Sequence, residues 1–295
     1  MNTQRIMENS VLVQIDFKKL GNMRQGNVDK IETDSDKDRL RLKKVLFEGP
    51  EYAAIGKFDN QLRAWLLRRA IQVRMSFYGV YILPLGLLER VERKLAEAVP
   101  QRRELVDRFM AVYEQEREQA RSRLNGQFRE ADYPPVQQAS EPFAIGWRYV
   151  TFEVPETLPP EILERERRER AAALEAMTED VRAALRESLG GLVSHLVESL
   201  TPKPDGKMPK FYDTTVTNLV EFLELFNARN ITGDQELASM ADRAKDVIAC
   251  ASPAMLRSYK TSQDRVRAGM TEVKKAVDGL IATAPNRRKF NFDAA

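Results

Sequence analysis

The side chains most often used in catalysis are sparse in this chain of 295 residues. His195 is the only histidine, and its neighbour Ser194 cannot form a nucleophile–base pair with it, because adjacent residues of a helix point in different directions. Cys250 is the only cysteine, which excludes an internal disulfide and a site with several cysteine ligands. We expect it to be a small buried residue. A zinc site would need an unusual all-carboxylate shell, so we expect neither a metal nor a cofactor.

The spacing of residues also indicates neither a phosphate-binding loop nor an acid–base pair. Gly190-Gly191 is not followed by the Lys and Ser/Thr that complete a phosphate-binding loop. The carboxylates lie mostly beside Arg and Lys in helix-patterned stretches, where ion pairs satisfy them. Any two of them could be named as an acid–base couple, so no couple is indicated. The sequence therefore predicts a protein that is not an enzyme.

Two groups of basic residues are candidates for binding nucleic acid or a partner protein. A basic helix face can hold phosphate or an acidic surface, and it can equally be a solvated face paired with nearby carboxylates. The basic tail contains Phe290 and Phe292 and is either a docking peptide or a frayed chain end. The candidate residues are Arg63, Arg68, Arg69 and Arg74 in the first group and Arg287, Arg288 and Lys289 in the second.

An aromatic row, Trp147, Tyr149 and Phe152, lies in the segment Phe143 to Val154, where apolar residues alternate with others. Such a row can be a stacking platform for bases. Aromatic alternation on a strand more often fills a core, and we favour that interpretation.

Composition favours a helical protein of balanced charge. Lys and Arg number 47 against 44 Asp and Glu, for a net charge of +3, which gives no overall argument for nucleic acid. Charged residues make up 31% and Gly and Pro are few, a combination typical of long helices with solvated faces. No stretch reaches the roughly 20 apolar residues of a membrane span, and the first ten residues lack the apolar segment of a signal peptide. We expect a cytoplasmic protein with no membrane contact.

Two long helix-patterned stretches, Gln101 to Phe128 and Glu161 to Leu200, dominate the chain. Each has apolar residues at three- and four-residue spacings that form one narrow stripe flanked by Arg and Glu. Because neither helix can bury its stripe alone, we expect them to pack together as an antiparallel, coiled-coil-like hairpin. Gly190-Gly191 marks either a close helix crossing or a break.

The clearest strand signals are Ser10 to Phe17 and Phe143 to Val154, which we expect to pair with each other. Gly21 to Asp38 is expected to be a loop, and Leu40 to Phe47 a short strand or a helical turn. The pattern from Ile55 to Phe77 predicts a helix.

The remaining segments divide the chain. Tyr78 to Pro84 is expected to be a buried turn, and Pro100 either kinks the next helix or begins a new one. Prolines and a glycine in residues 201–210 indicate a linker. The predicted domains are a strand and hairpin domain in residues 1–200 and a helical bundle in residues 211–295. The predicted fold class is mainly α, with an elongated antiparallel helical hairpin, a small β element and a C-terminal helical bundle.

Four segments carry a resemblance to a known family: the strand Ser10 to Phe17, Leu62 to Leu95 with its Tyr-Gly-Val-Tyr-Ile-Leu-Pro, Phe143 to Trp147 leading to Pro159-Pro160, and Phe226 to Ile231. With them the chain resembles a family of uncharacterised phage, prophage and mobile-element proteins. Phe17-Lys18-Lys19-Leu20 stands where that family has a tryptophan-rich segment. Members tend to be encoded beside a MoxR-type AAA+ ATPase and a von Willebrand-type protein like the cobalt-chelatase subunits.

The resemblance implies an accessory role to such a machine or to phage DNA metabolism. Our leading hypothesis is a non-enzymatic adaptor or scaffold that acts through protein–protein contacts, with the AAA+ ATPase as the candidate partner. The alternative is a nucleic-acid-binding accessory factor in phage DNA metabolism or recombination. The sequence leaves self-association open.

Overall fold

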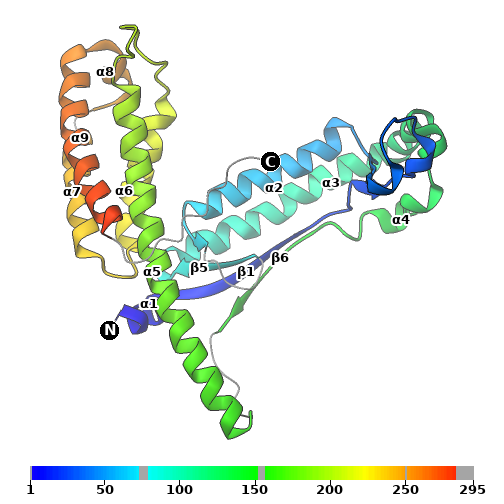
Figure 1. Ribbon diagram of the computed structural model, residues 1–295, viewed down its shortest axis with the longest axis horizontal. Coiled ribbons are helices and arrows are strands. Elements are labelled where there is room, and N and C mark those ends of the chain that lie inside the picture. The colour runs from blue at the N-terminus through cyan, green and yellow to red at the C-terminus, as the bar shows by residue number, and fades with distance from the viewer. Residues whose placement is uncertain (1, 73–78, 152–156, 250, 284–295) are drawn as a thin grey trace. The chain divides into compact units, whose positions relative to one another are not determined.

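A computed structural model describes residues 2–72, 79–151, 157–249 and 251–283 (Figure 1). These residues are mainly helical, which confirms the predicted fold class at that level. The chain divides into two compact units. Unit 1 comprises Met1–Leu12, Arg68–Leu87 and Val150–Ala295, and unit 2 comprises Val13–Leu67 and Leu88–Tyr149. The chain therefore passes between the units several times.

Unit 1 is a helical bundle with an aliphatic core. Its helices are α1 (Asn2–Asn9), α5 (Pro160–Ser199), α6 (Asp213–Arg229), α7 (Gln235–Ile248), α8 (Pro253–Ser258) and α9 (Lys260–Ala282). The second half of α5 packs on α9 and α6, and α9 also packs on α7 (Figure 1). Leu185, Leu189 and Val193 of α5 are completely buried in this core.

Gly190 lies at a close crossing of α5 and α9. A Cβ at this position would be 3.1 Å from the Ile281 side chain and 3.4 Å from that of Val277. Helix α5 continues unbroken through both glycines. Of the two alternatives for Gly190-Gly191, the close crossing is the one observed.

Side chains set the starts of the short helices in unit 1. The Asp234 carboxylate accepts a hydrogen bond from the Leu237 amide at the start of α7, and the Ser252 hydroxyl accepts one from Met255 at the start of α8. Such caps satisfy amides that have no partner within the helix. Pro160 and Pro253 occupy first-turn positions, where proline costs no hydrogen bond.

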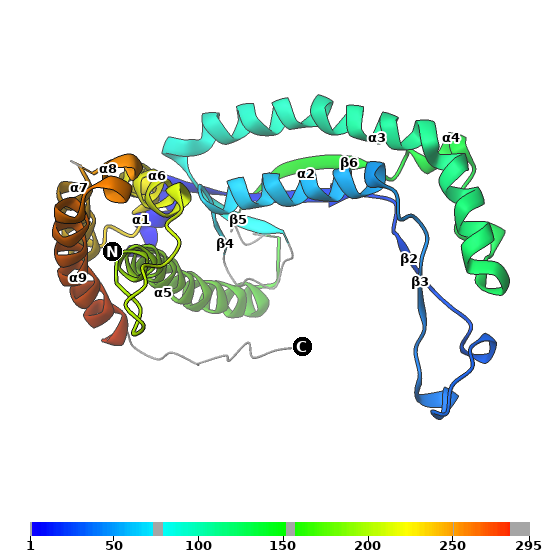
Figure 2. The same ribbon diagram turned by 90° about the horizontal axis from the view of Figure 1, so that it is seen from above.

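Unit 2 contains α2 (Pro50–Leu67), α3 (Leu88–Leu124) and the short α4 (Val136–Ala139). Helices α2 and α3 lie side by side (Figure 2). Strands β2 (Met23–Gln25) and β3 (Lys43–Val45) pair antiparallel, with Met23 opposite Val45. The core is largely aromatic, and its buried rings include Phe47, Tyr52, Phe109, Tyr113 and Tyr133.

A buried carboxylate, Glu116 of α3, holds the start of α2. Its Oε2 accepts hydrogen bonds from the amides of Glu48 at 3.2 Å and Gly49 at 3.1 Å. A Cβ on Gly49 would lie 2.2 Å from Glu116 Oε1, so a larger residue here would displace the carboxylate from this position. The negative charge also suits the positive end of the α2 dipole.

The main sheet has the strand order β4, β5, β1, β6. Its strands are β1 (Ser10–Lys18), β4 (Ile71–Gln72), β5 (Val80–Pro84) and β6 (Ala144–Val150). Strand β1 begins in unit 1 and continues into unit 2. Because β1 and β6 are neighbours, the predicted pairing of the strands at Ser10 to Phe17 and Phe143 to Val154 is confirmed.

The predicted pairing of the two long helices is wrong. Gln101 to Phe128 belongs largely to α3 of unit 2, which packs on α2, whereas Glu161 to Leu200 belongs to α5 of unit 1, which packs on α9 and α6. The apolar stripes are present, and each is buried by a different neighbour. Periodicity shows which face of a helix is apolar and does not select its partner.

Helix α5 and the C-terminal helices belong to the same unit, so the division also differs from the predicted domains 1–200 and 211–295. The predicted linker in residues 201–210 is a loop without helix or strand, and it joins α5 to α6 within unit 1. Prolines and a glycine were therefore correct evidence for a loop and insufficient evidence for a domain boundary.

Several local predictions also need correction. The helix predicted from Ile55 to Phe77 ends at Leu67, and strand β4 follows. The turn predicted at Tyr78 to Pro84 contains the fully buried strand β5. Gly21 to Asp38 includes β2, and the strand alternative holds for Leu40 to Phe47, which contains β3. Of the two alternatives for Pro100, the start of a new helix is wrong, because α3 continues through this residue.

Candidate functional site

The residues of the predicted basic cluster are divided between the two units. Arg63 lies on α2 in unit 2, exposed, with its guanidinium 4.5 Å from the centre of the Phe17 ring. Arg68 and Arg69 belong to unit 1, and both pair with Glu221 of α6, at 3.3 Å and 2.6 Å. The Arg69 side chain is only 3% exposed. Arg69 is therefore a buried ion-pair partner within unit 1.

The other predicted binding residues, Arg74, Arg287, Arg288 and Lys289, lie outside the described residues, as do Cys250 and Phe152. His195 lies in α5 with its Nε2 3.4 Å from the Thr215 hydroxyl of α6. In the described part of the chain, no three His, Cys, Asp or Glu side chains are grouped so as to hold a metal ion. None of the helices described there is long and apolar enough to cross a membrane.

Trp147 and Tyr149 are not core residues, so the favoured interpretation of the aromatic row is wrong for them. Trp147 is half-buried and Tyr149 is 46% exposed, on a strand at the edge of the sheet. Both side chains donate to one oxygen, Glu92 Oε1 of α3, Trp147 through its indole N–H at 2.7 Å and Tyr149 through its hydroxyl. Partial burial and the hydrogen bond to Glu92 raise the pKa of Tyr149 well above its ordinary value. The Glu92 carboxylate holds the half-buried Trp147 ring and the exposed Tyr149 ring in fixed positions.

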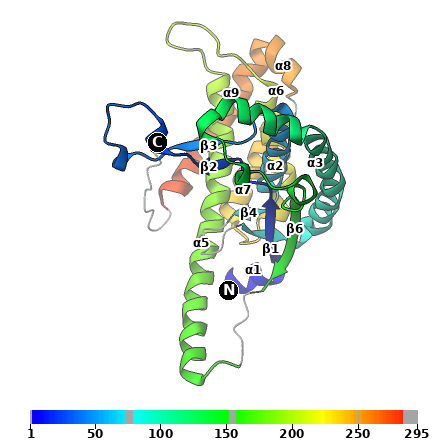
Figure 3. The ribbon, with the colours of Figure 1, turned by 90° about the vertical axis from the view of Figure 1, so that its right-hand side faces the viewer.

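The first part of α5 is the longest described helical segment without a buried side chain. None of the residues in 160–176 is buried, and Met177 is the first buried residue. Residues 160–173 extend roughly 20 Å at about 1.5 Å per residue. Figures 1 and 3 show this segment, which we call the α5 arm, continuing beyond α6–α9 of the same unit.

Glu and Arg alternate along the α5 arm, and they form local ion pairs. Nitrogen atoms of Arg165 lie 3.4 Å from Glu166 Oε1 and 3.9 Å from Glu169 Oε1. The second pair joins residues four apart, and pairs of that spacing stabilise an isolated helix by about 0.2 to 0.5 kcal/mol each. Ile162, near the start of the arm, is 38% exposed. The arm therefore presents a preformed helix with mixed charge and an apolar end.

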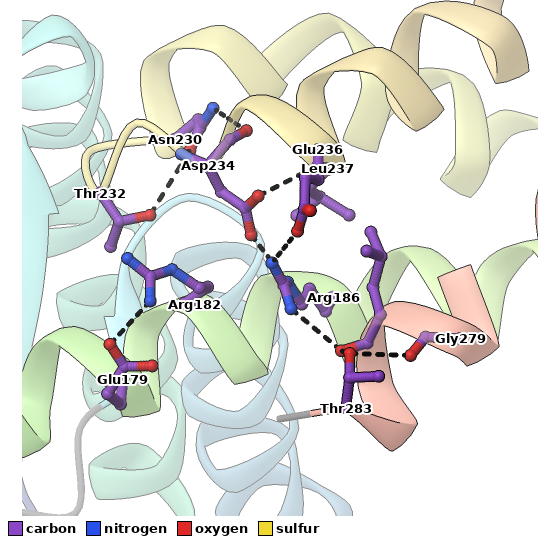
Figure 4. Close-up of polar contacts among 11 residues, drawn as sticks. Glu179, Arg182, Arg186, Asn230, Thr232, Asp234, Glu236, Leu237, Gly279 and Thr283 are labelled. Atoms are coloured by element: carbon purple, nitrogen blue, oxygen red, sulfur yellow. Dashed lines mark hydrogen bonds and ion pairs between the residues drawn. The ribbon is translucent and has the colours of Figure 1, made fainter. Parts of the chain in front are cut away.

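A polar network around Arg186 ties three helices of unit 1 together (Figure 4). Arg186 donates from Nε to Asp234 Oδ2 at 2.7 Å, from Nη1 to the Leu280 carbonyl at 2.9 Å and from Nη2 to Glu236 at 3.2 Å. Arg186 lies on α5, Asp234 and Glu236 at the start of α7, and Leu280 near the end of α9. We interpret the network as a structural cross-link.

The electrostatics of Asp234 agree with this structural role. Burial by itself raises the pKa of the Asp234 carboxyl, but the Arg186 hydrogen bond, the Leu237 amide and the nearby arginine charges together hold it below its usual value. Asn230 supports the same turn, since its Oδ1 accepts a hydrogen bond from the Asp234 amide at 2.9 Å.

Sequence reasoning missed Glu92 and Arg186 because their partners lie far away in the chain. Glu92 is 55 residues from Trp147, and Arg186 is 48 residues from Asp234. One signal was available, since Asp234 follows Gly233 at a turn before an apolar helix pattern, which is typical of a helix N-cap.

Comparison with known proteins adds no relationship. No protein-family model, curated protein or solved structure matches this chain.

Proposed function

We propose that this protein is a non-enzymatic adaptor of a phage or other mobile genetic element, which binds a MoxR-type AAA+ ATPase through the α5 arm. The observation that supports the proposal is the arm itself, a helix of about four turns with no buried side chain in residues 160–176. The resemblance to a family encoded beside such ATPases supports the choice of partner.

The α5 arm is already helical in the chain without a partner. A helix that is already formed loses less conformational entropy on binding than a segment that must fold. Its Glu and Arg residues can exchange local ion pairs for pairs across an interface, which favours orientation and partner choice. Ile162 and the half-buried Leu163 supply an apolar anchor at the end of the arm. A partner helix with complementary charges would fit this surface.

A binding titration with a matched pair of variants tests the proposal. The purified chain is titrated with a MoxR-type ATPase from the same genome and, separately, with single- and double-stranded DNA at low and physiological salt. The test variant is Arg167→Glu with Arg168→Glu, two exposed residues of the arm. The control is Arg243→Glu with Arg265→Glu, which makes the same charge change on exposed positions of α7 and α9.

We expect the ATPase to bind the original chain and the control, and to bind the arm variant at least tenfold more weakly. Equal binding by all three would contradict a role for the arm. DNA binding that persists at physiological salt would instead favour the nucleic-acid alternative, because non-specific phosphate contacts weaken steeply with salt. An Arg63→Glu variant would then show whether that exposed residue takes part.

A further inference from the structure

Strand β6 is an outer strand of the main sheet. In the strand order β4, β5, β1, β6 it pairs with β1 alone (Figure 1). Among the described residues no backbone hydrogen bond joins β6 to a loop, so its outer edge presents N–H and C=O groups that another strand can pair. None of the seven residues of β6 is buried, whereas all five residues of β5 are. The outer edge of β6 is therefore open to a further strand.

This edge lacks the usual features that prevent strand pairing. Exposed edges in soluble proteins are commonly protected by proline, by lysine or by being very short. The sequence Ala-Ile-Gly-Trp-Arg-Tyr-Val of β6 contains no proline and no lysine, and β4, at the other end of the strand order, has only two residues. Arg148 is the one charged residue of β6, and its Nε donates to Gln14 Oε1 of β1 at 2.8 Å. This contact draws the Arg148 side chain toward β1 and away from the outer edge.

Two aromatic side chains of β6 are already held in place. Side chains alternate between the two faces of a strand, so Ile145, Trp147 and Tyr149 share one face. Trp147 and Tyr149 both donate to Glu92 Oε1. Because this carboxylate orders the two rings before any partner binds, pairing of the strand costs little additional side-chain entropy.

We propose that β6 pairs antiparallel with β6 of a second copy of this chain. Residues opposite each other in an antiparallel pair lie on the same face, so the twofold axis must pass beside a residue of the strand. Pairing all seven residues puts the axis at the central residue, Trp147, which then faces Trp147 of the second copy. The other opposed pairs are Gly146 with Arg148, Ile145 with Tyr149 and Ala144 with Val150.

The strand is self-complementary in this register. Opposed aromatic and β-branched side chains stabilise an antiparallel pair, whereas like charges opposite each other destabilise it. Tyr149 faces Ile145, and Arg148, the single charge of the strand, faces Gly146, so no like charges meet. One pair of strands is a small interface, and we expect a dissociation constant on the order of 10 to 100 μM. The dimer goes beyond the proposed adaptor function, which rests on the α5 arm.

Sedimentation velocity of the full chain tests the pairing at protein concentrations from about 1 to 300 μM, which span the expected dissociation constant. The test variant is Gly146→Lys, which places a lysine opposite Arg148 of the second copy, twice in each dimer. The matched control is Gly146→Glu, which adds a side chain of similar size and opposite charge at the same position. A Cβ at Gly146 meets no atom within 4 Å beyond its chain neighbours, so the monomer accommodates both substitutions.

We expect the original chain to dimerise reversibly as its concentration rises. Gly146→Lys should dimerise at least about threefold more weakly than the original chain and Gly146→Glu at least about threefold more tightly, because each dimer contains two such cross-strand pairs. The double variant Gly146→Lys with Arg148→Glu restores opposite charges across the pair, and it should dimerise more tightly than Gly146→Lys alone.

Cysteine cross-linking tests the register independently, in a chain in which Cys250→Ser removes the native thiol. Directly opposed residues of an antiparallel pair have Cα atoms about 4.5 to 5.5 Å apart, which a disulfide can bridge. Trp147→Cys should therefore form a disulfide-linked dimer under mild oxidation. The control Tyr149→Cys also removes a contact with Glu92, but its two thiols lie more than about 13 Å apart along the paired strands and should not cross-link.

Three results would overturn the proposal. The first is a chain that stays monomeric up to about 300 μM, a measurement that depends on no variant and that would leave the edge to an extended peptide of another protein. The second is equal affinity of Gly146→Lys and Gly146→Glu, which would place any dimer contact elsewhere. The third is cross-linking of Tyr149→Cys as fast as that of Trp147→Cys, which would contradict the register.

Discussion

Unit 2 is packed around aromatic rings, whereas unit 1 is packed around aliphatic helix stripes. In unit 2, Phe109 contacts the rings of Phe47, Tyr52, Tyr113 and Phe143 with centroids between 5.2 and 6.0 Å apart. In unit 1, the centre of the core is formed by Leu, Val and Met side chains of α5 and α9.

The difference follows from the kind of backbone that surrounds each core, which is partly irregular in unit 2 and helical in unit 1. Unit 2 contains long segments without regular structure, whose carbonyls need partners. Tyrosines of its core supply them, since the Tyr52 hydroxyl donates to the Leu20 carbonyl at 2.5 Å and the Tyr113 hydroxyl to that of Pro134 at 2.8 Å. The long helices of unit 1 satisfy most of their own backbone groups, so apolar stripes suffice between them. In this protein, tyrosine hydroxyls of the core therefore hold loop carbonyls in unit 2, whereas aliphatic side chains pack the helices of unit 1 together.

The largest effect is expected from Phe109→Ala. Phe109 is completely buried, and removing a ring of this kind costs about 3 to 5 kcal/mol of unfolding free energy. Chemical denaturation followed by tryptophan fluorescence measures the loss, because Trp65 and Trp147 both belong to unit 2.

The matched change in unit 1 is Leu185→Ala, for which we expect about 2 to 5 kcal/mol. It should lower the transition seen by circular dichroism while leaving the tryptophan transition nearly unchanged. Equal shifts of both signals in both variants would show that the two cores unfold as one. The aromatic and aliphatic cores would then have no separate stabilities to compare.

A second prediction concerns the buried ion pair of unit 2. Arg102 donates to both oxygens of Asp59, at 2.7 and 3.1 Å, and to the Lys18 carbonyl at 2.8 Å. Asp59→Ala leaves the arginine charge buried, which should cost about 3 to 5 kcal/mol. In the double variant Asp59→Leu with Arg102→Met, much of this loss should be recovered. A double variant as unstable as the single one would show that the Lys18 contact matters more than the charges.

The Arg186 network of unit 1 should give a smaller, pH-dependent effect. The pKa of Asp234 is lower in the folded protein than in the unfolded chain, so the stabilisation is complete above the ordinary value of about 3.9. It is lost as the pH falls through the lower, folded-state value. Asp234→Asn should cost about 1.5 to 3 kcal/mol at pH 7, as expected for a hydrogen bond to a charged group.

The measurement is the unfolding free energy of the original chain and of Asp234→Asn between pH 2.5 and pH 7. The two curves should converge toward the acidic end. A constant difference between them would show that the carboxylate charge has no part in the network.

The sequence predicted well which faces of helices and strands are apolar and where loops lie. It predicted poorly which helices pack together and which charged side chains pair. Alternating residues identified both β1 and β6, and only one other long strand pattern was available for pairing. For the two long helices, several apolar stripes in the chain were possible packing partners. The prediction that α3 packs on α5 is wrong, because α5 packs on α9, which follows a proline-rich loop in the sequence. The pairing of Arg69 could not be predicted for a related reason. Glu221 is 152 residues from Arg69 along the chain, so no local pattern shows that this arginine is already paired.

The smallest effect is expected at the exposed aromatic pair of unit 2. Tyr149 is 46% exposed, so loss of its hydrogen bond to Glu92 in Tyr149→Phe should cost less than about 1 kcal/mol at pH 7. The pH dependence is more informative. Because the pKa of the folded tyrosine is raised, its contribution is complete below the ordinary value of about 10 and is lost as the pH rises above it.

Tyr52, Tyr113 and Tyr133, in the core of the same unit, also have raised pKa values, that of Tyr133 being about 12. The original chain should therefore lose stability above pH 10 through several tyrosines, and Tyr149→Phe should lose slightly less. Absorbance titration at 295 nm would show one fewer late-titrating tyrosine in the variant. If Tyr149 instead titrates at its ordinary pH, its hydroxyl does not share the Glu92 carboxylate, and Trp147 alone is held by that residue.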